Sequence, residues 1–206
     1  LPPVQHASAA EVIQRYELDT DGIDSGATYL IVAKSYAKAL KSATGSNNGV
    51  SVTLNGNTAT ADSTAYGWTF TASGDKYTIR NNSTYLGRSS SQVAAGSSST
   101  TWTVTNNGSG NYNVKQTSSN SWWGGSSYNL RWSNSNNTFQ ASSSNSDPVR
   151  LYKHTGASGI GANYVRLAGE YRGVQCGAKF AEVFRKLDVS LRVTELEGAT
   201  DAFNVA

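Results

Sequence analysis

The chain contains little cysteine, no methionine and no long apolar run, and each shortage narrows what it can be. The chain has a single cysteine, Cys176, so an intrachain disulfide is excluded. One interpretation is an exported protein from an organism that does not rely on disulfides. The other is that Cys176 is a small buried thiol in the C-terminal segment. No stretch of about 18 apolar residues is present, so no membrane span is expected. The start at Leu1-Pro2-Pro3 and the absence of methionine indicate a mature or excised segment.

Charge is also scarce. Charged residues make up 15% of the 206 residues, whereas about 25% is usual in globular proteins. Lysine and arginine are scattered, apart from a small grouping at Lys34, Lys38 and Lys41. A nucleic-acid-binding protein would carry a basic stripe, so nucleic acid is not expected as a partner. Aromatic residues at 10% argue against disorder. A polar, uncharged and aromatic-rich chain is typical of an extracellular β protein.

The residue types that perform catalysis do not form a recognisable set. The two histidines, His6 and His154, are expected to be ordinary solvated residues, and neither a G-x-S-x-G nor an H-E-x-x-H motif is present. Asp62, Asp75 and Asp147 fall in predicted loops, where a turn-forming role is expected. The sequence alone does not exclude the carboxylate pair that glycoside hydrolysis requires. We therefore expect no enzyme activity, no cofactor and no metal site.

The chain does contain one pattern in three copies. Residues 28–32, 76–80 and 111–115 are similar, and the second and third copies follow strands that begin at Trp68 and Trp102. Repetition at this spacing marks copies of a unit too small to bury its own apolar face. Short strands separated by Ser, Asn and Gly clusters predict a closed barrel or a sandwich. The threefold repetition favours a β-trefoil-like barrel.

The predicted fold class is mainly β, with a β-trefoil-like barrel followed by a small α+β (ββαβ) domain. In the second domain, apolar residues at helical spacing over residues 178–187 predict its helix. The expected segments are an extended N-terminal lead-in strand region at 1–25, the β-trefoil-like domain at 26–154, a glycine-rich linker at 155–162 and the ββαβ domain at 163–206.

Two turn motifs give specific expectations. Residues 19–24 look superficially like a calcium loop, but they lack the glycine and the glutamate that an EF-hand places at positions six and twelve. A turn at Asp21-Gly22 is the better interpretation. Residues 50–54 alternate in polarity, meet Asn55-Gly56 and return through residues 58–60. This pattern predicts a hairpin with a type I′ turn.

The clearest break in the repeat is the segment 121–132, which holds four aromatic rings. Sugars present C–H faces that stack on flat rings, while amide and guanidinium groups bond to their hydroxyls. In a strand over residues 128–132, Tyr128 and Trp132 share one face and are expected in the core, as are Trp68 and Trp102. Of Trp122 and Trp123, one is expected to be exposed, unless both pack over the barrel mouth. The predicted ligand-binding residues are Trp122, Trp123, Asn120, Asn129 and Arg131.

A family resemblance rests on degenerate aromatic and aliphatic positions across residues 26–153. The matching segments are residues 26–32 with 39–40, 68–70 with 77–79 and 85–87, 128–131, and 149–153. The chain resembles a module of large surface and secreted proteins of Firmicutes, often gut clostridia. This resemblance implies an extracellular, non-catalytic module beside adhesive or immunoglobulin-like domains. The chain is also loosely similar to ricin-type β-trefoil lectins, although their Gln-x-Trp motif is absent.

These patterns lead to one expected function and two alternatives. We expect an extracellular adhesion module of a bacterial cell-surface protein that binds carbohydrate through the aromatic loop, with a glycan or a host or cell-surface protein as partner. Alternatively, strand 11–18 pairs with a neighbouring module or subunit and builds a stalk or filament. An unpaired strand at 11–18 would favour that alternative. A glycoside hydrolase is the second alternative and is less favoured.

Overall fold

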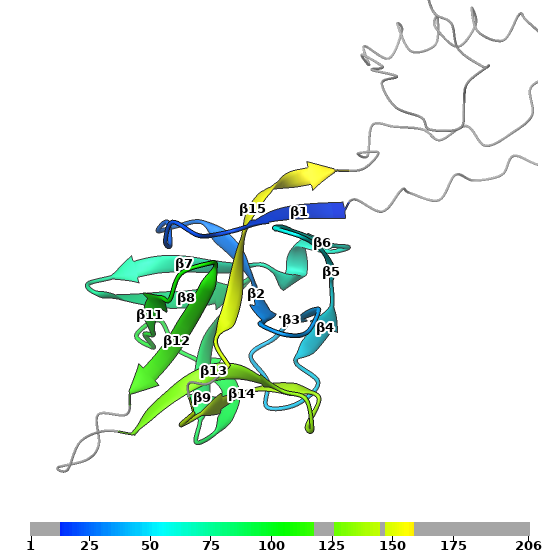
Figure 1. Cartoon of the computed structure of the whole chain (residues 1–206). Helices are drawn as coiled ribbons and strands as arrows, with labels where there is room; N and C mark the ends of the chain where they lie inside the picture. The colour runs from blue at the N-terminus through cyan, green and yellow to red at the C-terminus, as the bar shows by residue number, and fades with distance from the viewer. Residues whose placement is uncertain (1–12, 118–125, 145–146, 159–206) are drawn as a thin grey trace, which may run out of the picture. The chain divides into compact units, whose positions relative to one another are not determined.

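The computed structural model describes residues 13–117, 126–144 and 147–158, which form one compact unit from Ile13 to Ser158 (Figure 1). Within it the chain is mainly β, as expected. The only helical element among these residues is the short 3₁₀ helix η1 (Thr64–Tyr66). The strands are β1 (Ile13–Leu18), β2 (Thr28–Ala33), β3 (Lys38–Leu40), β4 (Gly49–Ser51), β5 (Thr53–Asn55), β6 (Thr58–Ala61), β7 (Trp68–Ser73), β8 (Lys76–Asn81), β9 (Thr84–Ser89), β10 (Gln92–Gly96), β11 (Thr103–Asn106), β12 (Asn111–Thr117), β13 (Ser127–Ser133), β14 (Thr138–Ser142) and β15 (Val149–Ser158).

The strands close into a barrel. Following the hydrogen-bonded neighbours, β2, β7, β8, β9, β10, β14, β13, β12 and β15 form a closed path of nine strands, completed by pairing of β15 with β2. A shorter antiparallel path also closes, through β2, β7, β8, β11, β12 and β15. Its link between β8 and β11 is a bridge in which Tyr77 and Trp102 exchange both backbone hydrogen bonds, of 2.9 and 2.8 Å.

The register of the short ring repeats three times. The tyrosine of each copy lies opposite a residue at the start of the next strand of the ring: Tyr29 opposite Trp68, Tyr77 opposite Trp102, which directly precedes β11, and Tyr112 opposite Val149. On the other side of each tyrosine strand, the aliphatic residue two positions after the tyrosine pairs with an apolar residue: Ile79 with Phe70, Val114 with Val104, and Ile31 with Leu151. The repeat in the sequence is therefore a repeat of strand pairs.

The two tryptophans of the repeat lie in the core, as expected. Trp68 and Trp102 are fully buried. The Nε1–H of Trp68 donates to the carbonyl of Leu40 at 2.7 Å, and that of Trp102 donates to the carbonyl of Leu86 at 2.8 Å. A buried indole usually finds a partner for its N–H. For these two tryptophans it is a carbonyl of the hairpin that precedes the tryptophan in the chain, β3–β4 for Trp68 and β9–β10 for Trp102.

Three hairpins, β3–β4, β9–β10 and β13–β14, pack against one another. Asn48, which is fully buried, joins the first hairpin to the third. Its Nδ2 donates to the carbonyls of Thr44 and Phe139, and its Oδ1 accepts from the Thr138 hydroxyl and the Phe139 N–H. The second hairpin reaches the third through the bond from the Ala141 N–H to the Ser91 carbonyl, 2.9 Å.

The tyrosines of the repeat converge on the loop that follows β1. The Tyr112 hydroxyl donates to the Asp19 carboxylate at 3.0 Å, the Tyr29 hydroxyl accepts from the Asp24 N–H at 2.9 Å, and the Tyr77 hydroxyl lies 3.5 Å from the Ile23 carbonyl. The Asp19 carboxylate also accepts from two N–H groups of the loop, those of residues 21 and 22. This bonding closes a bend at Asp21, where a turn was expected.

The predicted N-terminal strand is β1, and both of its edges are paired within the chain. Residues 13–18 pair with β15 and residues 14–17 with β6. Together with β5 and β6, this strand covers a second core on the outer side of β2 and β15 (Figure 1). That core consists of Tyr16, Leu30, Val32, Ala39, Val52, Ala59, Ala61 and Tyr152.

Two expected segment boundaries move. The lead-in was expected to end before the barrel domain, yet β1 belongs to the same compact unit. The glycine-rich linker was expected from residue 155, yet β15 continues to Ser158 because β1 lies beside it and pairs with residues 156–158. The ββαβ domain expected at 163–206 lies outside the described residues.

Candidate functional site

The predicted ligand-binding residues divide into two groups. Trp122, Trp123 and Asn120 lie outside the described residues. Asn129 and Arg131 lie on β13, which begins close after that segment. The region can therefore be examined on β13 and on the elements beside it.

Asn129 is buried, with 7% of its surface exposed. Its Nδ2 lies 3.5 Å from the carbonyl of Ser144, so the amide is directed at the chain just beyond β14. The expectation that this amide is available to a ligand depended on strict alternation of an inner and an outer face. In β13 both faces carry buried residues, because the hairpin packs on the core and on its neighbouring strands.

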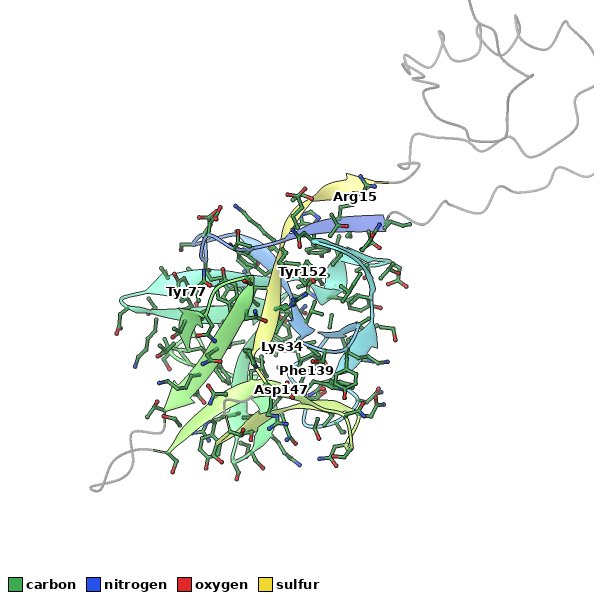
Figure 2. All side chains as sticks on the ribbon, viewed as in Figure 1. Arg15, Lys34, Tyr77, Phe139, Asp147 and Tyr152 are labelled. Atoms are coloured by element: carbon green, nitrogen blue, oxygen red, sulfur yellow. The ribbon has the colours of Figure 1, made fainter. Side chains whose placement is uncertain are left out.

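Arg131 is half-buried and forms an ion pair with Asp147, with 3.7 Å between Nη2 and Oδ2. Asp147 is labelled in Figure 2. Asp147 was expected only to form a turn. The pair keeps the guanidinium group beside β13 and leaves it partly accessible, so Arg131 keeps the potential to donate to a ligand.

Tyr128 differs from its expected place in the core. It is half-buried, while Trp132, from the same face of the strand, is buried. The guanidinium carbon of Arg88 lies 4.0 Å from the centre of the Tyr128 ring, which is close cation–π geometry. Arg88 also donates to the Ser90 carbonyl at 3.1 Å. These contacts place an aromatic ring and a planar cation side by side.

Sequence reasoning did not single out Arg88. A signal was nevertheless present, because Arg88 follows Leu86 at the same distance as Trp132 follows Leu130. The second copy of the repeat therefore places a cation where the third places an aromatic ring. No motif, however, indicated that Arg88 would contact Tyr128, whose strand belongs to the third copy.

A second region was also missed: a polar cleft of about 310 Å³. None of its lining residues is acidic, and Arg80 and His154 are its basic members. The residues that line it are Tyr16, Thr28, Thr64, Gly67, Thr69, Arg80, Asn82 and His154. They come from six segments between residues 16 and 154, which explains why no local motif indicated them.

The floor of the cleft is a row across three strands. Thr28 pairs with Thr69, and Thr69 pairs with Arg80. Their neighbours Tyr29, Trp68 and Ile79 are buried in the barrel, so alternation directs the row outward. The hydroxyls of Thr28 and Thr69 lie 3.2 Å apart.

One wall is an aromatic pair. Tyr16 on β1 faces His154 on β15, and their ring centres lie 4.9 Å apart at 62°. His154 Nε2 lies 2.9 Å from Gln14 Oε1, within hydrogen-bond distance, which fixes the orientation of the imidazole ring. Burial raises the pKa of Tyr16 to about 12, so its hydroxyl stays protonated and able to donate.

The opposite wall is held by Asn81. Its Nδ2 donates to the carbonyls of Ala65 and Gly67 at 2.6 and 2.8 Å, which fixes η1 and the residues beside it against the end of β8. A Cβ at position 67 would lie 2.5 Å from Cγ2 of Thr28. Glycine at this position therefore permits the close approach of this wall to the floor.

Neither region has the composition of a metal or redox centre. In the described part of the chain, no three His, Cys, Asp or Glu residues gather where they could hold a metal ion. No helix among the described residues is both long and apolar enough to span a membrane. His6 and Cys176 lie outside these residues, and both Asp62 and Asp75 are exposed.

Comparison with protein-family models, with curated proteins and with solved structures gives no match for this chain.

Proposed function

We propose that the chain is a non-catalytic extracellular adhesion module of a bacterial surface protein, with β-trefoil architecture, and that it binds carbohydrate. The trefoil assignment is supported by the six-strand ring, by the threefold repeat of its register and by the three hairpins that pack together. A β-trefoil offers loops and strand ends from three similar units as places for a ligand.

The observation that carries the binding proposal is the contact of Arg88 with the half-buried ring of Tyr128. Arg131, half-buried beside Asp147, lies on the same strand as Tyr128. An aromatic surface with a few oriented donors is the combination that sugar sites use. Trp122 and Trp123 precede this strand by a few residues in the sequence and were predicted to bind the same ligand.

A glycan array tests the proposal. The unaltered chain is compared with Tyr128→Ala and with the double variant Trp122→Ala, Trp123→Ala. We expect binding of at least one glycan, lost in both variants while the circular dichroism spectrum is unchanged. Tyr36→Ala is the matched control, because Tyr36 is an exposed aromatic residue on another loop. Binding that survives in both variants would contradict the assignment of this surface.

The alternatives have less support. Assembly through the N-terminal strand requires a free edge, yet both edges of residues 14–17 are paired. A glycoside hydrolase requires two carboxyl groups at a cleft, yet the cleft described above has no acidic lining residue. Asp147 is already paired with Arg131. Carbohydrate binding without catalysis is therefore preferred.

A further inference from the structure

We propose that the cleft between Tyr16, His154 and Arg80 is a second binding site, and that it takes one carboxylated sugar unit. The cleft shares no residue with the Tyr128 surface. The inference therefore does not depend on the proposed function of that surface, and either can fail without the other.

The charge of the cleft selects an anion. Arg80 contributes a permanent positive charge, and none of the other seven lining residues is acidic. A guanidinium group presents two parallel N–H donors that match a carboxylate. The Arg80 side chain also makes a cation–π contact, because its guanidinium carbon lies 5.9 Å from the centre of the Tyr85 ring.

The remaining polar groups suit a polyhydroxylated ligand. The hydroxyls of Thr28 and Thr69 form a row beside Arg80, and each can donate or accept. The Asn82 amide adds both donor and acceptor atoms. Sugar hydroxyls also act in both senses, so they fit this lining better than a compact inorganic anion, which only accepts.

The size of the cleft suits a single ring. Its volume of about 310 Å³ is at the lower end of the range for small-molecule sites, roughly 300–1,000 Å³. The imidazole of His154, held by Gln14 and packed against Tyr16, offers a flat, half-buried surface for the apolar face of the sugar.

The walls are fixed before any ligand arrives. Asn81 holds η1 in place by two hydrogen bonds, and β1 is paired on both sides. A preformed site loses little conformational entropy on binding. We therefore infer a preformed site, whose binding can be tested with a small soluble probe.

Nuclear magnetic resonance titration of the full chain with three probes tests the assignment. Glucuronic acid carries the carboxylate, glucose is its neutral counterpart, and inorganic phosphate reports a site for any anion. We expect glucuronic acid to shift the backbone resonances of residues lining the cleft, and to bind at least tenfold more tightly than glucose, corresponding to one good charge-assisted contact. Equal binding of glucose, or a response to phosphate but not to glucuronic acid, would overturn the proposal.

Two substitutions and one control locate the ligand. Arg80→Gln removes the charge and should weaken glucuronic acid binding by roughly tenfold or more, corresponding to about 1.4 kcal/mol. Asn82→Gly deletes the amide, and glycine accepts the positive φ of 50° at this position, so the turn is kept. Arg15→Gln makes the same charge change on β1 at an exposed residue outside the cleft (Figure 2). If Arg80→Gln and Arg15→Gln affect binding equally, Arg80 does not hold the carboxylate and the proposal is wrong.

Discussion

The tyrosines of the three copies occupy equivalent positions, but their hydroxyl groups form chemically different hydrogen bonds. The Tyr112 hydroxyl donates to the carboxylate of Asp19, which is 8% exposed. The Tyr29 hydroxyl instead accepts from a backbone N–H of the same loop. A hydrogen bond to a buried charge contributes more than a neutral one, about 1.5–3 against 0.5–1.5 kcal/mol. Tyrosines at equivalent positions of the repeat therefore contribute unequally to the free energy of unfolding.

This difference predicts unequal effects of removing each hydroxyl. Tyr112→Phe should lower the free energy of unfolding by about 1.5–3 kcal/mol, and Tyr29→Phe by about 0.5–1.5 kcal/mol. Urea denaturation of the two variants beside the unaltered chain measures both. A larger loss for Tyr29→Phe would show that Asp19 does not depend on the Tyr112 hydroxyl for its stabilisation.

Single residues also mark the limit of prediction from sequence. Burial of Trp68 and Trp102 followed from their repeated context, and it is confirmed. Tyr128 was expected in the core and is half-buried, while Asn129 was expected at a ligand and is buried. Alternation separates the two faces of a strand, but it does not tell whether neighbouring hairpins cover the outer face.

At the scale of elements, the hairpin of β5 and β6 shows that a turn motif alone does not fix the register of the strands. The Asn55-Gly56 pair predicted a type I′ turn, but Asn55 pairs with Thr58 and the turn residues are Gly56 and Asn57. Only Gly56 has a positive φ, of 58°, whereas type I′ needs two such residues. A hairpin is present, but its turn lies one residue later than expected. Only residues 53–55 pair with β6, because residues 49–51 of the expected strand pair with β3.

The packing of the first hairpin on the third depends on the turn that carries Asn48. Asn48→Ala should leave four partner groups without their bonds, three of them in buried contacts, and we expect a loss of more than about 3 kcal/mol in the free energy of unfolding. Asn57→Ala, at an exposed asparagine in another turn, should change it by less than about 0.5 kcal/mol. Thermal and urea unfolding give both values. Similar small losses in the two variants would mean that Asn48 does not join the hairpins.

At the scale of the whole molecule, the closed barrel follows from the repeat, but the clefts on it do not. Three similar strand pairs can bury their apolar faces only by closing on one another, so the sequence pattern was sufficient to predict a barrel. The polar cleft needs β1, η1 and the part of β15 that carries His154 to lie beside the ring strands β2, β7 and β8. Those contacts join residues far apart in the sequence, and no repeat or local motif encodes them.

The barrel as a whole should be sensitive to alkali because its buried phenols must stay neutral. Burial raises the pKa of Tyr16 and of Tyr29 to about 12, and it also raises that of Tyr112. In the unfolded chain these phenols ionise near pH 10. The folded state therefore holds its protons more tightly, so this contribution to stability is complete below about pH 10 and is lost as the pH rises towards 12.

Each such tyrosine should lower the free energy of unfolding by about 1.4 kcal/mol per pH unit above pH 10. The exposed ion pair between Lys153 and Asp24 raises the lysine pKa and acts in the same direction. Urea denaturation at a series of pH values measures the slope, and the ultraviolet absorbance of phenolate reports ionisation. Tyr16→Phe should reduce the slope, because phenylalanine fills the same core position without a proton to lose. A free energy of unfolding that stayed constant up to pH 12 would contradict this account, since it would require the buried phenols to ionise as readily in the folded barrel as in water.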